Sequence, residues 1–441
     1  MSDSNTILNY LNEGNFEKFL HNSHELPHDY WNDFKNLRSL ISAIRFKDLG
    51  MRDYIYRSVL NLDDKFKPIA ANYIIDFLYH IEKELRNLAS DLLIKLGEHS
   101  NQNLLQLLSE EDVDVKKFAC DILGYTGTDE EIPDIVMLLN DKDMNVFNSA
   151  VESIGAIFER HKEKIGLADS MVNLLISIYN VNNLDTKPVI IESIAKIGGD
   201  IAVDFLVDLL DKEDDIFIKT AVIDGLAICG NSPFLCDRLL SELNNYPNEI
   251  QPVILKTIIA ISFRIGHEVN ISDEVRHIAW ASMQDIEPDI RTAGLLALNG
   301  NYTKEDIPLV VDQYINNSDE LRYYILTNLF NDNNIELFEF FLQNFLSKIE
   351  SGDNNVSLFE MIGIIHNISE EIEYQNLSHL LKVFVVNLKD FIRFEQYEIF
   401  DNLYQVNHDS FRSIIAELSF SEENPAEFTQ LNNYLLENYN N

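Results

Sequence analysis

The chain has 441 residues, of which 46% are hydrophobic, and its formal net charge is −39 at pH 7. This hydrophobic content is ample for a buried core and argues against an intrinsically disordered protein. A chain this acidic repels phosphate backbones and anionic membrane surfaces, which excludes the usual modes of nucleic-acid binding and favours protein partners that are basic or locally basic.

The first residues, MSDSNTILNYLNEG, lack the basic start and long apolar run of a signal peptide. The apolar stretches elsewhere are too short to cross a bilayer, so we expect no membrane insertion. The three cysteines lack the CxxC spacing of a zinc or redox site. These features together predict an intracellular, cytoplasmic protein.

Residues 1–67 are predicted to form an irregular helical cap, and they carry the chain's basic island. Eight Lys or Arg and four Asp lie between Lys35 and Lys67. Arg38, Arg45 and Arg52 are spaced seven apart, so they share one face if a single helix continues through Gly50. This face either docks on the chain's own first acidic repeat or forms a docking patch for an acidic partner or a second copy.

A histidine cluster, His21, His24 and His28, precedes this island. Imidazole groups with nearby carboxylates suit zinc or iron, and this spacing would align on one helix. Pro27 lies inside the cluster and instead favours a loop or a helix start. We therefore expect a solvated joint without stoichiometric metal, and no cofactor.

The stretch Leu104–Gly127 predicts two helices joined by an acidic turn, with Gly124 and Gly127 able to end the second helix. The stretch 132–158 repeats its pattern 31 positions on, and such a fixed period is typical of a solenoid. Small residues in the second helices should let neighbouring helices approach closely. The matched pairs are Asp112 and Asp143, Val115 and Val146, Ala119 and Ala150, and Gly124 and Gly155.

About eight helix pairs are predicted over residues 68–333. In the unit 201–230, Asp214, Phe217 and Ala221 are placed opposite Asp143, Val146 and Ala150. The period fades from Asn334, and residues 334–441 are predicted to form a C-terminal helical cap. Its expected helices are 335–349, 356–368, 372–388, 391–404, 410–418 and 425–436.

An acidic turn followed by an apolar and a basic residue recurs at Leu85-Arg86, Val115-Lys116, Ile290-Arg291 and Leu321-Arg322. This pattern resembles the HEAT-repeat family, particularly its short bacterial form related to phycobilisome-lyase HEAT-like repeats. The resemblance implies an all-α fold, an α-solenoid superhelix with irregular helical caps at both ends. The acidic residues should cap the second helices, and the basic residues should pair with an acid of a neighbouring repeat.

The preferred functional interpretation is a non-enzymatic scaffold or adaptor, in bacterial signalling or complex assembly, that binds proteins through the concave face of the solenoid. Arg322 and Tyr323 are candidate partner-binding residues, because Arg and Tyr are favoured at interface hot spots. The alternative is a lyase-like or metal-dependent HEAT-repeat enzyme. Metal-dependent HEAT-repeat hydroxylases use His-Glu pairs on successive repeats. Such pairs occur here only at His24-Glu25 and His267-Glu268, which are not at repeat spacing.

Overall fold

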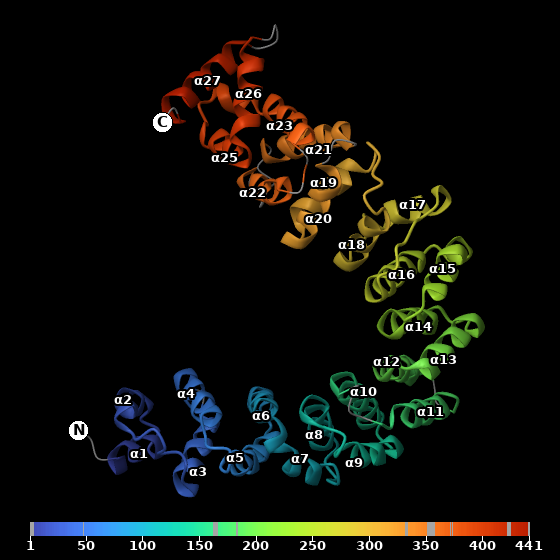
Figure 1. The fold of residues 1–441 in the computed structure, drawn as a ribbon. Helices are drawn as coiled ribbons and strands as arrows, with labels where there is room; N and C mark the ends of the chain where they lie inside the picture. Colours follow the sequence, from blue (N-terminus) through green and yellow to red (C-terminus); the bar gives the residue numbers. More distant parts are fainter. Residues whose placement is uncertain are drawn as a thin grey trace. The chain divides into compact units, whose positions relative to one another are not determined.

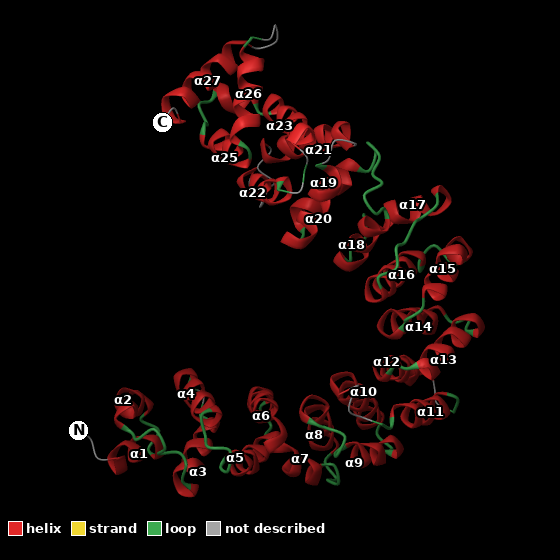
Figure 2. Ribbon diagram, in the orientation of Figure 1, coloured by secondary structure: helices red, strands yellow, loops and turns green. Residues whose placement is uncertain are grey.

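The computed structural model describes residues 4–46, 48–161, 166–181, 184–330, 334–350, 358–370, 372, 374–420 and 425–439. Every regular element in these ranges is a helix, so the all-α prediction is confirmed (Figure 1, Figure 2). Of the described helices, none is both long and apolar enough to cross a bilayer. The chain divides into two compact units, residues 1–230 and 231–441.

Residues 1–230 form a two-layered stack of helix pairs, in which each first helix is followed by a second helix of the same pair (Figure 1). Each second helix packs on the second helix of the next pair, from α2 through to α14. The first helices are α1 (Ser4–Asn12), α3 (Phe34–Ser42), α5 (Lys67–Ile74), α7 (Asn101–Leu107), α9 (Ile132–Met137), α11 (Ala168–Tyr179) and α13 (Asp200–Lys212). The second helices are α2 (Phe16–Asn22), α4 (Leu49–Leu60), α6 (Lys83–Leu96), α8 (Val113–Thr126), α10 (Met144–His161), α12 (Lys187–Ile197) and α14 (Ile216–Cys229).

Acidic turn residues start several second helices by accepting hydrogen bonds from their free N–H groups, as predicted. Asp112 Oδ1 accepts from the N–H groups of Asp114 at 3.0 Å and Val115 at 3.2 Å. The side chains of Asp48, Asp143 and Asp215 cap α4, α10 and α14 in the same way.

The predicted register of the α13–α14 pair is wrong by one residue. Asp215, and not Asp214, caps α14, so Ile218 takes the buried position that had been assigned to Phe217. Phe217 is 80% exposed. Val222 likewise occupies the buried place expected for Ala221. The two neighbouring aspartates made the slip possible, because either one fits the pattern of an acidic cap.

Small residues bring the second helices close together. Gly124 lies inside α8 and does not end it, which corrects the prediction, whereas Gly127 is the C-cap. A Cβ atom added to Gly124 would lie 3.2 Å from the Cα of Ser153 in α10. Gly124 is therefore a contact point between helices, and Ala119 and Ala150 are fully buried as expected.

Residues 231–441 begin with three further pairs, α15 (Pro233–Glu242) with α16 (Gln251–Ile265), α17 (Asp273–Ser282) with α18 (Pro288–Ala297), and α19 (Ile307–Asn316) with α20 (Asp319–Leu329). With the five pairs from α5 to α14, the described residues between 67 and 329 hold the eight predicted helix pairs.

The C-terminal helices are α21 (Ile335–Glu350), α22 (Leu358–Ser369), α23 (Tyr374–Asn387), α24 (Lys389–Arg393), α25 (Glu398–Val406), α26 (His408–Ser419) and α27 (Pro425–Tyr439). The predicted helix 391–404 is two helices, because the chain turns between α24 and α25, where Glu395 has a φ of 57°. The first two residues predicted for the helix 356–368 lie outside the described residues. The predicted domain boundaries at 67 and 333 remain predictions.

Candidate protein-interaction site

The three arginines of the basic island do not lie on one helix, so that prediction is wrong. Arg38 is on α3, Arg45 ends the short 3₁₀ helix Ala43–Arg45, and Arg52 is on α4. The backbone becomes extended at Phe46, and Asp48 then caps a new helix.

Two of these arginines contact the next helix pair. The Arg38 guanidinium lies over the ring of Tyr73 in α5, 5.9 Å from its centroid. Arg52 pairs with Glu84 of α6 at 3.7 Å. These contacts favour internal docking for Arg38 and Arg52, and a role in partner binding remains a proposal.

The basic residues that follow the buried apolar position mostly contact their own helix pair. Arg86 Nη1 donates to the carbonyl oxygens of His80 at 2.8 Å and Ile81 at 2.9 Å. Arg291 repeats this geometry on Asp285 and Ile286. Each guanidinium thereby satisfies carbonyl groups in the turn that joins the two helices of its pair.

The prediction that these side chains pair with a neighbouring acid is therefore correct for Lys116, which binds Asp141 of the next pair at 2.7 Å, and wrong for Arg86 and Arg291. Arg52 belongs to the same set, since its Nε donates to the carbonyl of Phe46, six residues earlier. The role of Arg52 was not predicted, although Asp48 and Met51 have the same spacing of a capping acid and a buried apolar residue as Asp112 and Val115.

Arg322 and Tyr323 differ in how far their side chains are exposed for contact with a partner. The Arg322 side chain donates to the carbonyls of Tyr314 and Ile315 and pairs with Asp319. Tyr323 lies in α20 and is 40% exposed. Tyr323 thus remains a proposed contact residue, while the guanidinium of Arg322 is engaged within its own helix pair.

The histidine cluster does not lie on one helix. His21 is in the last turn of α2, His24 is in the 3₁₀ helix Ser23–Glu25, and His28 lies in the following turn. The three side chains are exposed. Within the described ranges, no group of three or more His, Cys, Asp or Glu residues is arranged to hold a metal ion.

A row of carboxylates that was not predicted lies on the second helices of residues 1–230. The five second helices α6, α8, α10, α12 and α14 each carry one acid at an equivalent position: Asp91, Asp121, Glu152, Glu192 and Asp224. We call these five residues the carboxylate row.

Contacts between small residues fix the register of the row. For Glu152, Glu192 and Asp224, the residue after the acid packs on the residue three places after the acid of the preceding second helix. Ser153 packs on Gly124 in this way, Ser193 packs on Gly155, and Gly225 packs on Ala195. The acids therefore occupy matching positions on successive helices.

Glu152 is the electrostatically strained member of the row. Its neighbours have cations, since Asp121 pairs with Lys117 at 2.5 Å and Glu192 pairs with Lys196 at 2.6 Å. No ion pair involves Glu152 within the described part of the chain. Glu152 is exposed on α10, but desolvation by the packed helices raises its pKa and the charges of Asp121 and Glu192 raise it further, whereas Lys117 and Lys196 lower it by less.

A sequence signal for the row exists in the tetrapeptides DILG, ESIG, ESIA and DGLA, which begin at the four acids from Asp121 to Asp224. Each places a Gly or Ala three positions after the acid. In a chain with 73 Asp and Glu, however, an acid alone does not single out a site. The structure supplies the missing information, which is the alignment of these acids on neighbouring helices.

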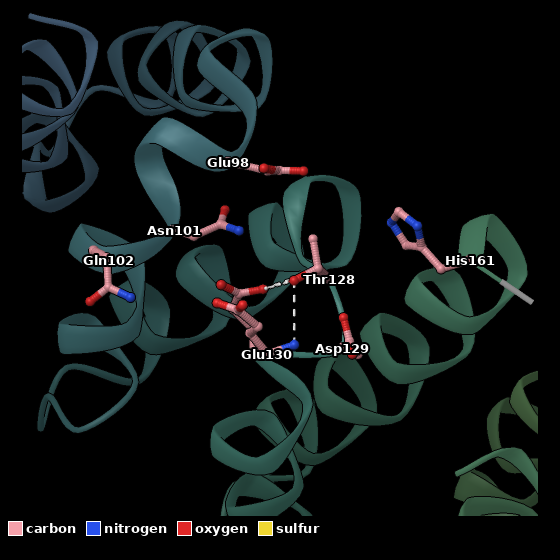
Figure 3. Close-up of a pocket in the computed structure, with 8 residues that line it drawn as sticks. Glu98, Asn101, Gln102, Thr128, Asp129, Glu130 and His161 are labelled. Atoms are coloured by element: carbon pink, nitrogen blue, oxygen red, sulfur yellow. Dashed lines mark hydrogen bonds between the residues drawn. The ribbon is translucent and has the colours of Figure 1, made fainter. Parts of the chain in front are cut away.

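A pocket of about 420 Å³ lies beside the loops that link the α5–α6, α7–α8 and α9–α10 pairs (Figure 3). Glu131, which is 4% exposed, accepts hydrogen bonds from the N–H of Thr128 at 2.8 Å and from its hydroxyl at 2.9 Å. The lining residues are Glu98, Asn101, Gln102, Thr128, Asp129, Glu130, Glu131 and His161.

No protein-family model matches this chain, and no curated protein matches its sequence. An engineered protein from a structural genomics consortium is similar in structure at 16% identity and a TM-score of 0.38, over 92% of this chain and 99% of that one. A homology model of the full-length AP-3 complex in an intermediate open conformation is similar at 12% identity and a TM-score of 0.38, over 98% of this chain and 95% of that one. The crystal structure of Kap121p is similar at 13% identity and a TM-score of 0.41, over 91% of this chain and 50% of that one. Values this low say nothing about activity, and the fold assignment rests on the helices described above.

Proposed function

We propose that this protein is a non-enzymatic interaction scaffold that binds a basic segment of a protein partner along the carboxylate row. The position of Glu152 carries the proposal. Its carboxylate lies between two other acids and has a raised pKa, so its ionisation at neutral pH is opposed by its surroundings. A lysine or arginine of a partner placed there would remove this penalty, and perturbed groups of this kind concentrate at functional sites.

The spacing of the row suits an extended partner. Packed helices lie about 8–10 Å apart, and the glycine and serine contacts keep the second helices at close approach. A chain in the polyproline II conformation advances about 3.1 Å per residue with three residues per turn, so every third side chain lies on one side and meets a new acid. A basic segment with cations at that interval would contact successive acids without changing its direction.

The net charge supports the choice of partner. With a formal charge of −39, long-range attraction speeds the approach of a basic protein and repels nucleic acid. Together with the resemblance to HEAT repeats, this favours a role as an adaptor in the assembly of a cytoplasmic complex.

Fluorescence anisotropy with a labelled oligolysine peptide tests the proposal. We expect the triple variant Asp121→Asn/Glu152→Gln/Glu192→Gln to bind about tenfold more weakly, and the dependence of affinity on salt to become shallower. Neutralising substitutions keep the shape of each side chain, so circular dichroism should be unchanged.

The matched control removes three exposed acids from the first-helix layer, as Asp76→Asn/Asp134→Asn/Asp204→Asn. This variant has the same change in net charge, so it should bind the peptide nearly as well as the wild type. Equal loss of binding in the two triple variants would mean that net charge alone attracts the peptide, and the carboxylate row would then have no specific role.

A further inference from the structure

Two first helices begin with nearly the same sequence, 175 residues apart: TDEEIP at 128–133 before α9 and TKEDIP at 303–308 before α19. The local geometry is also the same. Thr303 donates from its N–H at 2.6 Å and its hydroxyl at 2.8 Å to Asp306, as Thr128 does to Glu131. Both acids are almost fully buried, with 2% exposure for Asp306 and 4% for Glu131.

The two copies differ in the cation that neutralises the acid. Arg276 of α17 forms an ion pair with Asp306. The residue 175 positions before Arg276 is Asn101 of α7, which has no charge. Asn101 is instead engaged by Thr126, whose hydroxyl donates to its side-chain oxygen at 2.6 Å.

Among the described residues, no guanidinium pairs with Glu131 as Arg276 pairs with Asp306. Both side-chain hydrogen bonds to Glu131 within the described residues end on Oε2, which leaves Oε1 for another donor. A buried carboxylate without a cation is unfavourable, because charge is costly to remove from water unless it is paired.

The pocket occupies the space beside this carboxylate. Figure 3 shows Glu98, Asn101, Asp129 and His161 arranged around Thr128, and the pocket has a volume of about 420 Å³. Glu98 and Asp129 are acids at its wall, so the surroundings of Glu131 also favour a positive charge.

We propose that this pocket binds the guanidinium of an arginine carried by a protein partner, in the place that Arg276 takes on Asp306. Arginine suits the site better than lysine, because its planar fork presents several N–H donors at once and can satisfy Glu131 together with a second acid. The site is separate from the carboxylate row and does not depend on the function proposed for that row.

The test uses the full-length protein and three blocked tripeptides, Gly-Arg-Gly, Gly-Lys-Gly and Gly-citrulline-Gly, titrated by calorimetry or NMR. Citrulline keeps the shape of arginine and removes its charge. We expect the arginine peptide to bind at least about tenfold more tightly than the citrulline peptide, with the lysine peptide between them. Equal affinity for the arginine and citrulline peptides, or no binding by any peptide, overturns the proposal.

Two variants locate the binding. Glu98→Gln/Asp129→Asn changes only the wall and should weaken arginine binding severalfold at unchanged melting temperature. Asn101→Arg supplies the missing guanidinium within the chain, so it should abolish peptide binding and raise the melting temperature. If arginine binding is unchanged in Glu98→Gln/Asp129→Asn, the peptide binds elsewhere and the proposal is overturned, whether or not Asn101→Arg folds.

The remaining control concerns the chain's own cations. Lys162 and Lys164 follow His161 in the sequence and lie outside the described residues. Suppose that the wild type does not discriminate arginine from citrulline, but Lys162→Gln/Lys164→Gln does. The pocket is then filled by the chain itself, and a partner arginine is not its ligand. Tighter binding of the arginine peptide than of the citrulline peptide, by the same factor in wild type and in Lys162→Gln/Lys164→Gln, supports the proposal.

Discussion

Gly155 of α10 packs so closely on Ser193 of α12 that a Cβ atom on the glycine would lie 3.0 Å from the serine Cα. The serine hydroxyl completes the contact by donating to the carbonyl of Val151 in α10 at 2.8 Å. Because the two backbones touch at this point, Glu152 and Glu192, which directly precede Ser153 and Ser193, become neighbours. The same packing that stabilises the stack therefore also creates the charge repulsion at Glu152.

The first prediction is that Gly155→Leu destabilises the protein by at least about 1–3 kcal/mol, because the new side chain must displace α12. Gly363→Leu is the control, since Gly363 is also within a helix, α22, but has open space around its Cβ position. That substitution should be neutral or stabilising, because glycine is a poor helix former. Chemical denaturation of both variants is the measurement, and equal stabilities would show that the α10–α12 contact is looser than described.

The second prediction concerns pH. A carboxyl group whose pKa is raised in the folded state holds its proton more tightly there, so its contribution to stability is lost as pH rises through the folded pKa. Glu152→Gln should therefore raise the free energy of unfolding at pH 7, by up to about 1 kcal/mol after allowing for solvent screening.

This gain should shrink as the pH falls below the ordinary glutamate value of 4.5, where the wild-type residue is protonated in both states. Urea denaturation at pH 7 and at pH 4 measures the difference. Glu130→Gln is the control, because Glu130 is exposed and is not a member of the carboxylate row. It should show little change in stability at either pH. A stability loss in Glu152→Gln at pH 7 would show that the carboxylate is stabilised by a group not considered above.

The third prediction concerns the register of a bound partner. Two peptides of equal length and composition are compared, one with lysine at every third position and one with the lysines clustered at one end. The spaced peptide should bind about tenfold more tightly, because in the polyproline II conformation its lysines share one side and match helices that lie about 8–10 Å apart. The Asp121→Asn/Glu152→Gln/Glu192→Gln variant should lose this preference. Equal binding of the two peptides would leave a basic partner possible and exclude the extended, three-residue register.

The repeat architecture could be predicted from sequence because its signals are local. Asp112 and Asp143 cap the helices that follow them, and Val115 and Val146 are buried, as their 31-residue spacing indicates. The predictions failed where two local signals compete. The run from Phe34 to Leu60 has helical periodicity throughout, yet Asp48 is also a good cap, and the cap decided the outcome.

The candidate sites were harder to predict because they depend on which residues become neighbours. Arg86 and Arg291 were recognised as equivalent, but the free carbonyls that they bind were assigned to no partner. The pocket has a sequence signal in the two Thr-x-Glu-acid-Ile-Pro segments. Its meaning depends on the difference between Arg276 at one site and Asn101 at the other. This difference matters only because the structure places Arg276 beside Asp306 and places Asn101 and Glu131 in the wall of one pocket.

The last prediction returns to this exchange. Arg276→Ala should leave Asp306 buried without a cation, and we expect a loss of about 3 kcal/mol, since removing one partner of a buried pair leaves an uncompensated charge. Asp306→Asn in the same chain should recover part of the loss, because the asparagine side chain still accepts from Thr303 and carries no charge. The Arg276→Ala variant also converts the α19 site into a copy of the Glu131 pocket. Guanidinium ion added to this variant should therefore raise its melting temperature at low millimolar concentration, before the ion acts as a denaturant, while tetramethylammonium should not. A variant that is as stable as the wild type, or that responds equally to the two cations, would show that Arg276 does not neutralise Asp306, and the comparison between the two sites would lose its basis.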